Sequence, residues 1–192
     1  MRYQHLFTEI NKAKPRTILE IGTWDGNHSI QMINEAKKHN SDIKYIGFDV
    51  FENISPEIRE KELHSKSVQN HQYVKNKIKD STDANVILHV GYTTETLPLF
   101  KHEGHIDFIY IDGGHSLETI DNDWTYLKKF IGPNTRVIFD DYYTSSNKND
   151  IGCFNLISEL QKDPKYIVEV LEPSDMFNNG SLMINFVKLT LA

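Results

Sequence analysis

Apolar residues gather in seven short runs along the chain, and polar segments separate most of these runs. Several runs, such as ILEIG, YIGFDV, FIYID and VIFDD, are rich in Ile, Val, Phe and Tyr and show little alternation between apolar and polar positions. Such runs are typical of parallel strands that helices cover on both faces. The pattern predicts strands at residues 17–22, 44–50, 86–90, 106–112, 136–140, 166–171 and 182–189.

Between these runs, apolar residues recur at helical spacing. The expected helices cover residues 1–16, 27–39, roughly 56–79, 94–100, 117–130 and 155–162. Strands that alternate with helices predict an α/β fold, a Rossmann-like, doubly wound and mostly parallel sheet of seven strands. Ligands of such sheets bind at the carboxyl ends of the strands.

The last two strands depart from this alternation. Only residues 172–181, EPSDMFNNGS, separate them, which is short for a crossover helix but suits an antiparallel hairpin. A C-terminal antiparallel hairpin distinguishes a methyltransferase-type sheet from an ordinary nucleotide-binding Rossmann sheet.

The length of 192 residues predicts one domain over residues 1–192 and leaves too little chain for a second one. Hydrophobic residues at 39% and charged residues at 25% place it among globular proteins. The polar, partly helical stretch 53–83 is the one insertion-like region. It either covers the substrate entrance or forms a solvated helix.

The formal charge of -6 gives no electrostatic footprint for nucleic acid. Cys153 is the only cysteine, which excludes an intrachain disulfide and a cysteine metal cluster and favours a reducing compartment. The sequence shows neither the apolar stretch of a secretory signal nor a run of about 18 apolar residues for a membrane span. We therefore expect a cytoplasmic protein without nucleic-acid or membrane partners.

Residues 20–26 read EIGTWDG between the first strand and the following helix. Gly22 allows a sharp turn at the strand end, and Gly26 lets the backbone pass close to a ligand. Glu20 can organise this loop or attract the ammonium group of an amino-acid ligand. Dinucleotide enzymes use GxGxxG for the pyrophosphate, so this spacing favours a ligand without phosphates, such as S-adenosylmethionine. The alternative is an ordinary glycine turn.

Asp49 closes the second strand, where an acid can accept hydrogen bonds from both ribose hydroxyls, although an acid at a strand end can also be merely solvated. Tyr92 or its backbone would flank the adenine, although an aromatic residue there is as often part of the core. The predicted cofactor-binding residues are Glu20, Gly22, Thr23, Trp24, Gly26, Asp49, Val50, Gly91, Tyr92 and Asp112.

Asp112 closes the fourth strand, and Asp140 and Asp141 close the fifth. Adjacent parallel strands would bring these carboxylates together, which is costly unless a cation neutralises them. Carboxylate oxygens without a nearby cysteine favour Mg²⁺ over zinc, with Mn²⁺ or Ca²⁺ as replacements. The sequence thus predicts a metal site at these three residues. The alternative is that some of them cap helices or accept loop hydrogen bonds.

A cation held at Asp112 could bind a substrate oxygen, lower the pKa of its hydroxyl and orient it toward a methyl sulfonium. His115 could then take the proton, which makes Asp112 and His115 the predicted catalytic residues. Alternatively, His115 caps the helix that begins near Leu117.

With these blocks in order, the chain resembles class I S-adenosylmethionine methyltransferases, specifically the metal-dependent sugar O-methyltransferases related to macrocin O-methyltransferase and their small relatives. The blocks that carry the resemblance are TILEIGTWDGNHS, YIGFDVFE, VILHVGYTTETLP, FIYIDGGHSLETIDNDW and RVIFDDYY. The loop after Asp112 departs from the macrocin-type pattern, which has an acid and an aromatic residue there, and is closer to the DGxHS of the small relatives.

The resemblance implies a metal at the three aspartates, His115 as a candidate base, and Glu20, Gly22 and Asp49 in the cofactor site. We therefore expect S-adenosylmethionine and Mg²⁺ as cofactors and methyl transfer to a hydroxyl of a small molecule or saccharide. A nicotinamide oxidoreductase, an N-methyltransferase and a cofactor-binding protein without turnover are the alternatives. Contacts of a homo-oligomer, or a substrate lid, would use residues 1–16, 53–83 or 142–151.

Overall fold

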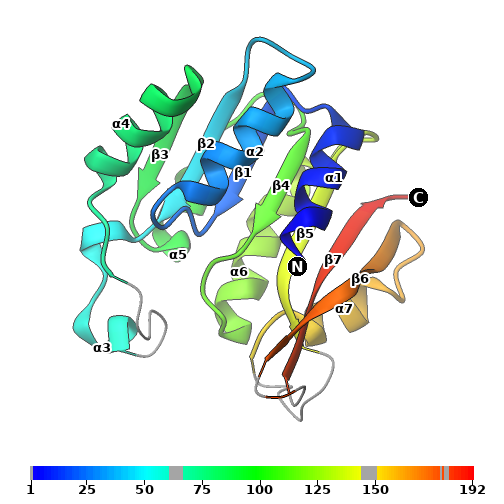
Figure 1. Cartoon of the computed structure of the whole chain (residues 1–192). Coiled ribbons are helices and arrows are strands. Elements are labelled where there is room, and N and C mark those ends of the chain that lie inside the picture. Colours follow the sequence, from blue (N-terminus) through cyan, green and yellow to red (C-terminus); the bar gives the residue numbers. More distant parts are fainter. Residues whose placement is uncertain (1, 61–66, 144–150, 178, 180–181) are drawn as a thin grey trace.

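The computed structural model describes residues 2–60, 67–143, 151–177, 179 and 182–192, and within them seven strands form one mixed sheet. The strands are β1 (Thr17–Ile21), β2 (Lys44–Asp49), β3 (Asn85–Val90), β4 (Phe108–Ile111), β5 (Arg136–Tyr143), β6 (Tyr166–Phe177) and β7 (Leu182–Leu191). Their order across the sheet is β3-β2-β1-β4-β5-β7-β6 (Figure 1). Strands β1 to β5 run parallel, and β7 lies antiparallel to both β5 and β6. This confirms the predicted Rossmann-like fold and its C-terminal hairpin.

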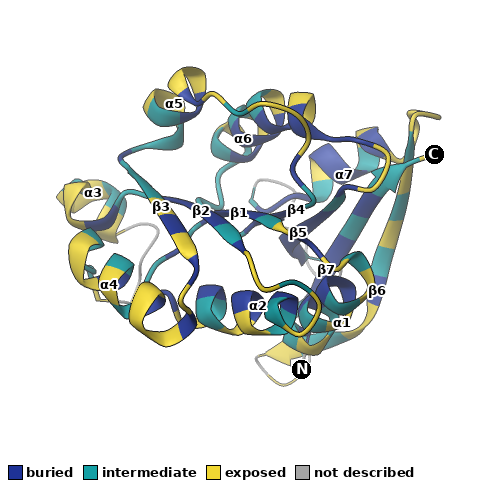
Figure 2. Cartoon of the chain, turned by 90° about the horizontal axis from the view of Figure 1, so that it is seen from above, coloured by how far each residue is buried: buried dark blue, intermediate teal, exposed yellow. Residues whose placement is uncertain are grey.

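Helices cover both faces of the sheet. Figure 2 shows α1 (Tyr3–Ala13), α2 (Asn27–Lys37) and α4 (His71–Thr82) on one face, and α5 (Thr93–Thr96), α6 (Leu117–Leu127) and α7 (Phe154–Leu160) on the other. Short turns of helix are η1 (Phe51–Asn53), α3 (Pro56–Ile58), η3 (Leu97–Leu99) and η4 (Lys128–Phe130). Each face has its own buried apolar cluster, which explains why the strands show little alternation. In the described part of the chain, no helix has the length and apolar character needed to cross a membrane.

The single helix expected over residues 56–79 is wrong for the described part of that range. Ser55 caps α3, with its hydroxyl accepting a hydrogen bond from the Ile58 N–H, and Asn70 caps α4 by accepting one from the Tyr73 N–H. Because both caps have extended backbone, each starts a new helix. Residues 61–66 of the predicted helix, and residues 144–150 of the predicted lid loop, lie outside the described residues.

The connection expected over residues 172–181 is shorter in the structure. β6 continues through Phe177 and pairs with β7 up to Leu182, with a register shift between Leu171 and Asp175. The hairpin therefore extends past the end of β5 and places Asp175 beside the N-terminal segment, where it bonds Arg2.

Candidate functional site

The parallel register of the central strands brings the predicted site residues to one edge of the sheet. Ile21 pairs with both Phe48 and Ile111, and Ile111 pairs with Phe139. The residues that follow these positions therefore meet at the carboxyl ends of neighbouring strands. They are Gly22, Asp49, Asp112 and Asp140.

The turn after β1 is pressed against the start of the loop after β4. Gly22 has a φ of +91° and its N–H donates to the Phe48 carbonyl over 2.8 Å. A Cβ atom at this position would lie only 1.8 Å from the carbonyl oxygen of Asp112. Both the backbone angle and the close approach thus require glycine.

Gly26 serves helix packing. Its φ of +74° starts α2, and a Cβ atom there would lie 2.9 Å from Ile78 Cγ1 and 3.1 Å from Val74 Cγ1, both on α4. Side chains of α4 therefore explain why this position needs glycine, and the ligand approach expected here stays a prediction.

Glu20 is buried, and its carboxylate faces protein groups. Its Oε2 accepts hydrogen bonds from the hydroxyls of Ser29 and Tyr45, and the Thr23 hydroxyl lies 3.1 Å from the same tyrosine oxygen. Burial raises the pKa of Glu20 to about 7, against the effect of these two hydrogen bonds. Of the two roles predicted for Glu20, the structure favours organisation of the loop and places Thr23 in the same network.

We expect Glu20 to make the protein less stable as the pH rises from 4.5 to 7. The pKa of Glu20 is about 7 in the folded chain, compared with its ordinary value of 4.5, so the folded state holds the proton longer than the unfolded state. The loss of unfolding free energy across that window should be on the order of 3 kcal/mol. Urea unfolding of the wild type and of Glu20→Gln at pH 5 and pH 8 measures it. Between pH 5 and pH 8, the variant should lose far less unfolding free energy than the wild type. An equal loss in both proteins would contradict the prediction.

Asp49 joins the ends of the first two strands. Its Oδ2 accepts a hydrogen bond from the Trp24 N–H over 2.7 Å, and its Oδ1 accepts one from the Phe51 N–H over 2.9 Å. The Trp24 indole donates to the Ser67 carbonyl over 2.9 Å. A carboxylate has about four acceptor positions, so Asp49 retains the capacity to bind hydroxyl groups while it fixes this turn.

The end of β3 closes the same region. Gly91 has a φ of +133°, and its N–H donates to the Asp49 carbonyl over 2.9 Å. The Tyr92 hydroxyl accepts a hydrogen bond from the Ser55 N–H over 2.9 Å, and the Val50 carbonyl accepts one within η1. The predicted adenine-side residues Val50, Gly91 and Tyr92 thus lie on connected loops.

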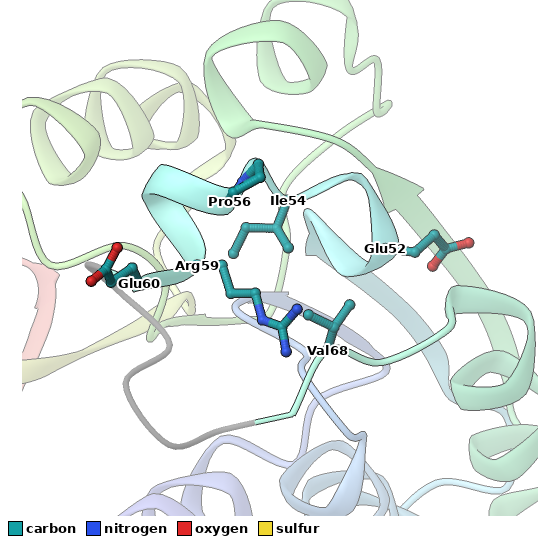
Figure 3. Close-up of a pocket in the computed structure, with 6 residues that line it drawn as sticks. All are labelled: Glu52, Ile54, Pro56, Arg59, Glu60 and Val68. Carbon is teal, nitrogen blue, oxygen red and sulfur yellow. The ribbon is translucent and has the colours of Figure 1, made fainter.

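A cavity of about 370 Å³ lies just beyond these loops, in the stretch that the sequence marks as insertion-like (Figure 3). Its lining consists of Glu52, Ile54, Pro56, Arg59, Glu60 and Val68. In Figure 3 Arg59 lies next to Ile54 and Val68, so the lining combines apolar side chains with one cation and the two carboxylates of Glu52 and Glu60. Sequence reasoning missed these residues, although two apolar residues within a polar stretch were a signal for them.

The acidic residues at the ends of β4 and β5 do come together. The hydroxyl of Tyr110, which is buried, lies 2.9 Å from Asp112 Oδ2 and 3.1 Å from Asp140 Oδ2, and its proton is shared between them. Neither Tyr110 nor the group that neutralises Asp140 was predicted. The neutralising group comes from the other end of the chain.

Arg2 neutralises the charge of Asp140 through a bidentate contact. Its Nε donates to Asp140 Oδ1 over 2.9 Å and its Nη2 donates to Oδ2 over 3.1 Å. Burial acts to lower the pKa of Arg2, but the charge and hydrogen bonds of Asp140 raise it on balance. Burial and the neighbouring Asp141 carboxylate raise the pKa of Asp140, which Arg2 opposes. The guanidinium is thus a fixed cation inside the acidic cluster.

The metal site predicted at Asp112, Asp140 and Asp141 is not formed by the described residues. They contain no group of three or more His, Cys, Asp or Glu side chains that could hold a metal ion. The physical reason is that each carboxylate already has a protein partner, because Asp140 faces Arg2, Asp112 accepts from Tyr110, and Asp141 faces His115. The magnesium assignment from the sequence therefore finds no support in the described residues and stays a prediction.

Asp141 points toward the loop after β4. It lies at an irregularity of the β5–β7 register with a φ of +57°, and its Oδ2 is 3.0 Å from His115 Nε2. The Tyr143 hydroxyl donates to its other oxygen over 3.1 Å. Burial acts to raise the pKa of Asp141, but the hydrogen bond and charge of His115 lower it below its usual value. The carboxylate therefore stays ionised beside the imidazole.

The cap expected as the alternative role of His115 belongs to its neighbour. Ser116 caps α6, with its hydroxyl accepting a hydrogen bond from the Thr119 N–H over 3.2 Å. The His115 side chain is 28% exposed and can therefore be reached from solvent. A partly exposed imidazole held by a buried carboxylate is an arrangement suited to accepting a proton.

Comparison with known proteins gives the family context of this site. A family model described as "Methyltransferase domain" matches residues 19–142. The uncharacterized protein R132 of Acanthamoeba polyphaga mimivirus is 26% identical over 132 residues, which cover 66% of this chain and 51% of that protein. The chain therefore spans about half the length of this relative.

Solved structures show the same fold. The O-methyltransferase TomG from Streptomyces achromogenes, described as involved in tomaymycin synthesis and solved with SAM, matches with a TM-score of 0.71 at 17% identity, over 98% of this chain and 78% of that one. An O-methyltransferase from Bacillus cereus in complex with SAH matches with a TM-score of 0.70 at 17% identity, over 98% and 80% of the two chains.

Proposed function

This chain belongs to the methyltransferase-domain family, and from that premise we propose that it transfers the methyl group of S-adenosylmethionine to a hydroxyl group. The observation that carries the proposal is the pair of His115 Nε2 and Asp141 Oδ2 at 3.0 Å, at the carboxyl ends of β4 and β5. A hydroxyl acceptor must lose its proton, and this pair supplies a base where the fold binds ligands.

The first three loops of the site fit the cofactor. S-adenosylmethionine supplies an electrophilic methyl group on a sulfonium when it is bound. Asp49 would accept hydrogen bonds from the ribose hydroxyls, and Val50 and Tyr92 would flank the adenine. The turn at Gly22 packs the loop after β1 directly against the backbone of Asp112, so the methionine part would lie beside the junction of these two loops.

The proton of the acceptor would go to His115. If Nε2–H donates to Asp141 Oδ2, the neutral ring would carry its proton at Nε2 and its lone pair at Nδ1. Nδ1 would take the hydroxyl proton, and the ionised Asp141 would stabilise the imidazolium. The remaining contribution is proximity, since the chain must hold the hydroxyl oxygen in line with the methyl group.

We propose a small molecule or saccharide as the acceptor. The formal charge of -6 does not suit binding of a nucleic-acid backbone. The predicted cofactor-binding residues also include no Lys or Arg that could bind phosphates. The single cysteine, Cys153, is a buried thiol, which suits a reducing compartment such as the cytoplasm.

Magnesium-assisted transfer is the second candidate for the same site. The meeting of Asp112, Asp140 and Asp141 at one sheet edge favours it, because hard cations prefer several carboxylate oxygens. It requires Asp140 to exchange Arg2 for the metal, and no step of the proposed mechanism depends on it.

Calorimetric titration with S-adenosylmethionine, and separately with NAD, tests the cofactor. We expect the wild type to bind S-adenosylmethionine with micromolar affinity and not to bind NAD. Asp49→Ala should weaken binding by about 10- to 100-fold, because it removes charge-assisted hydrogen bonds to the ribose.

Asp42→Ala is the matched control, since it removes an exposed aspartate just before β2 and should bind like the wild type. Circular dichroism should show that both variants are folded. NAD binding, or no binding of S-adenosylmethionine by the wild type, would contradict the proposal.

A further inference from the structure

We propose that the Arg2 guanidinium occupies the place of the divalent cation that the acidic residues at the ends of β4 and β5 would otherwise attract. The protein would then carry out its reaction with a built-in cation and without a metal at this site. This inference rests on the proposed methyl transfer and specifies how its acidic site is neutralised.

The first argument is the geometry of the contact. Two nitrogens of Arg2 meet the two oxygens of Asp140 at 2.9 and 3.1 Å, the bidentate arrangement in which a guanidinium binds a carboxylate best. A metal at Asp140 would need these same oxygens. These oxygens also accept hydrogen bonds from the Tyr110 hydroxyl and the Asp141 N–H, so a metal would have to displace a donor such as the guanidinium.

The second argument is that Arg2 is fixed from several sides. Its backbone N–H donates to Asp175 Oδ1 over 2.9 Å, and its Nη1 donates to Asp175 Oδ2 over 3.1 Å. Its guanidinium carbon lies 4.9 Å from the ring centre of Tyr3 and 5.4 Å from that of Phe186. Hydrogen bonds and cation–π contacts thus hold the cation in place.

The third argument is burial. The Arg2 side chain is 9% exposed, and that of Asp140 is 1% exposed. A metal that displaced Arg2 would take one of the two carboxylate partners from a buried guanidinium and leave only Asp175, and breaking a buried ion pair is strongly unfavourable. Mg²⁺ in addition demands near-octahedral oxygen ligands and gives up its water reluctantly.

Arg2 also reaches the proposed base through a short chain of hydrogen bonds. Asp140 Oδ1, which Arg2 holds, accepts a hydrogen bond from the Asp141 N–H over 2.7 Å. The side chain of Asp141 in turn holds His115. Arg2 is therefore a positioning residue, which fixes the backbone at Asp141 and so the direction of its carboxylate.

Titration with Mn²⁺, followed by the electron paramagnetic resonance signal of free Mn²⁺, tests the inference without any turnover. The samples are the wild type, Arg2→Met, Asp140→Asn and the Arg2→Met, Asp140→Asn double variant. Arg16→Met is the control, because it removes an exposed arginine far from Asp140 in the fold and changes the net charge equally. Arg2→Lys is a second variant, which keeps the positive charge but cannot make the bidentate contact with Asp140.

We expect no saturable Mn²⁺ binding up to millimolar concentration in the wild type, Arg16→Met or Arg2→Lys. Arg2→Met should gain one site, at least about tenfold tighter than any binding in the wild type, and the double variant should lose it. Saturable wild-type binding that Asp140→Asn abolishes would overturn the inference, whether or not Arg2→Met folds. Equally weak binding by folded Arg2→Met and the wild type would also overturn it.

Binding of S-adenosylmethionine on the same samples separates this inference from the proposed function. If the wild type does not bind the cofactor, the proposed function fails, whereas the Mn²⁺ comparison still reports on Arg2. If the cofactor binds and the wild type also takes up Mn²⁺ at Asp140, only the inference about Arg2 fails.

Discussion

Gly22→Ala should lower the free energy of unfolding by at least about 3 kcal/mol and abolish binding of S-adenosylmethionine. Two effects combine at this position. A φ of +91° is unfavourable for any residue with a Cβ atom, and that atom would lie 1.8 Å from the carbonyl oxygen of Asp112. The turn after β1 would have to move away from the loop after β4, and the expected cofactor site would open.

Gly104→Ala is the control that separates these effects. Gly104 has a similar φ of +80°, but no heavy atom lies within 4 Å of the position of its added Cβ. Gly104→Ala should therefore lose only the unfolding free energy that a positive φ costs a residue with a Cβ atom, about 1 kcal/mol. Urea unfolding and cofactor titration of both variants measure the difference. If Gly22→Ala loses no more stability than Gly104→Ala, the close approach to Asp112 has no energetic consequence and the explanation is wrong.

The sequence alone predicts which residues of this site meet at the carboxyl ends of the strands. Parallel strands with buried faces can be recognised from runs such as FIYID, and their carboxyl ends must meet in a doubly wound sheet. The proximity of Asp112 and Asp140 follows from that rule alone, and the shared contact with Tyr110 confirms it. The same reasoning brought Gly22 and Asp49 to one edge.

The partner of Asp140 could not be derived in this way. Arg2 lies 138 residues away in the sequence, and its side chain reaches the site only because α1 packs on the same sheet face as α2. Sequence patterns specify the buried side of a helix, but they do not show where a long side chain just before the helix, such as that of Arg2, will lie. The cluster of carboxylates was therefore assigned to a metal, because no nearby cation was visible in the sequence.

Local signals also had competing interpretations. His115 and Ser116 are adjacent, and both could precede the helix that starts at Leu117. The hydroxyl of Ser116 is the better cap, since serine is among the preferred residues at this position, and the structure uses it. In the stretch 56–79, helical spacing continued across Asn70, whose side chain starts a separate helix.

His115→Ala should reduce kcat by about 10² to 10⁴-fold while leaving the affinity for S-adenosylmethionine unchanged. The reason is that the imidazole contacts Asp141 and is proposed to take the proton of the acceptor, whereas the cofactor is expected on the loops after β1, β2 and β3. Release of S-adenosylhomocysteine, measured with a panel of phenolic and saccharide acceptors, gives kcat, and calorimetry gives the cofactor affinity. His39→Ala is the control, since it removes an exposed histidine that follows α2 and contacts Asn11 of α1.

The decisive comparison adds Asp141→Asn. This variant keeps the shape of the side chain but loses the charge that holds His115 Nε2 at 3.0 Å, so kcat should fall substantially on its own. If Asp141 acts through His115, the His115→Ala, Asp141→Asn double variant should be no slower than His115→Ala, because residues that act as a unit are not additive. Losses that multiply would show that the two residues act separately, and an unchanged kcat in His115→Ala would show that the proton leaves by another route.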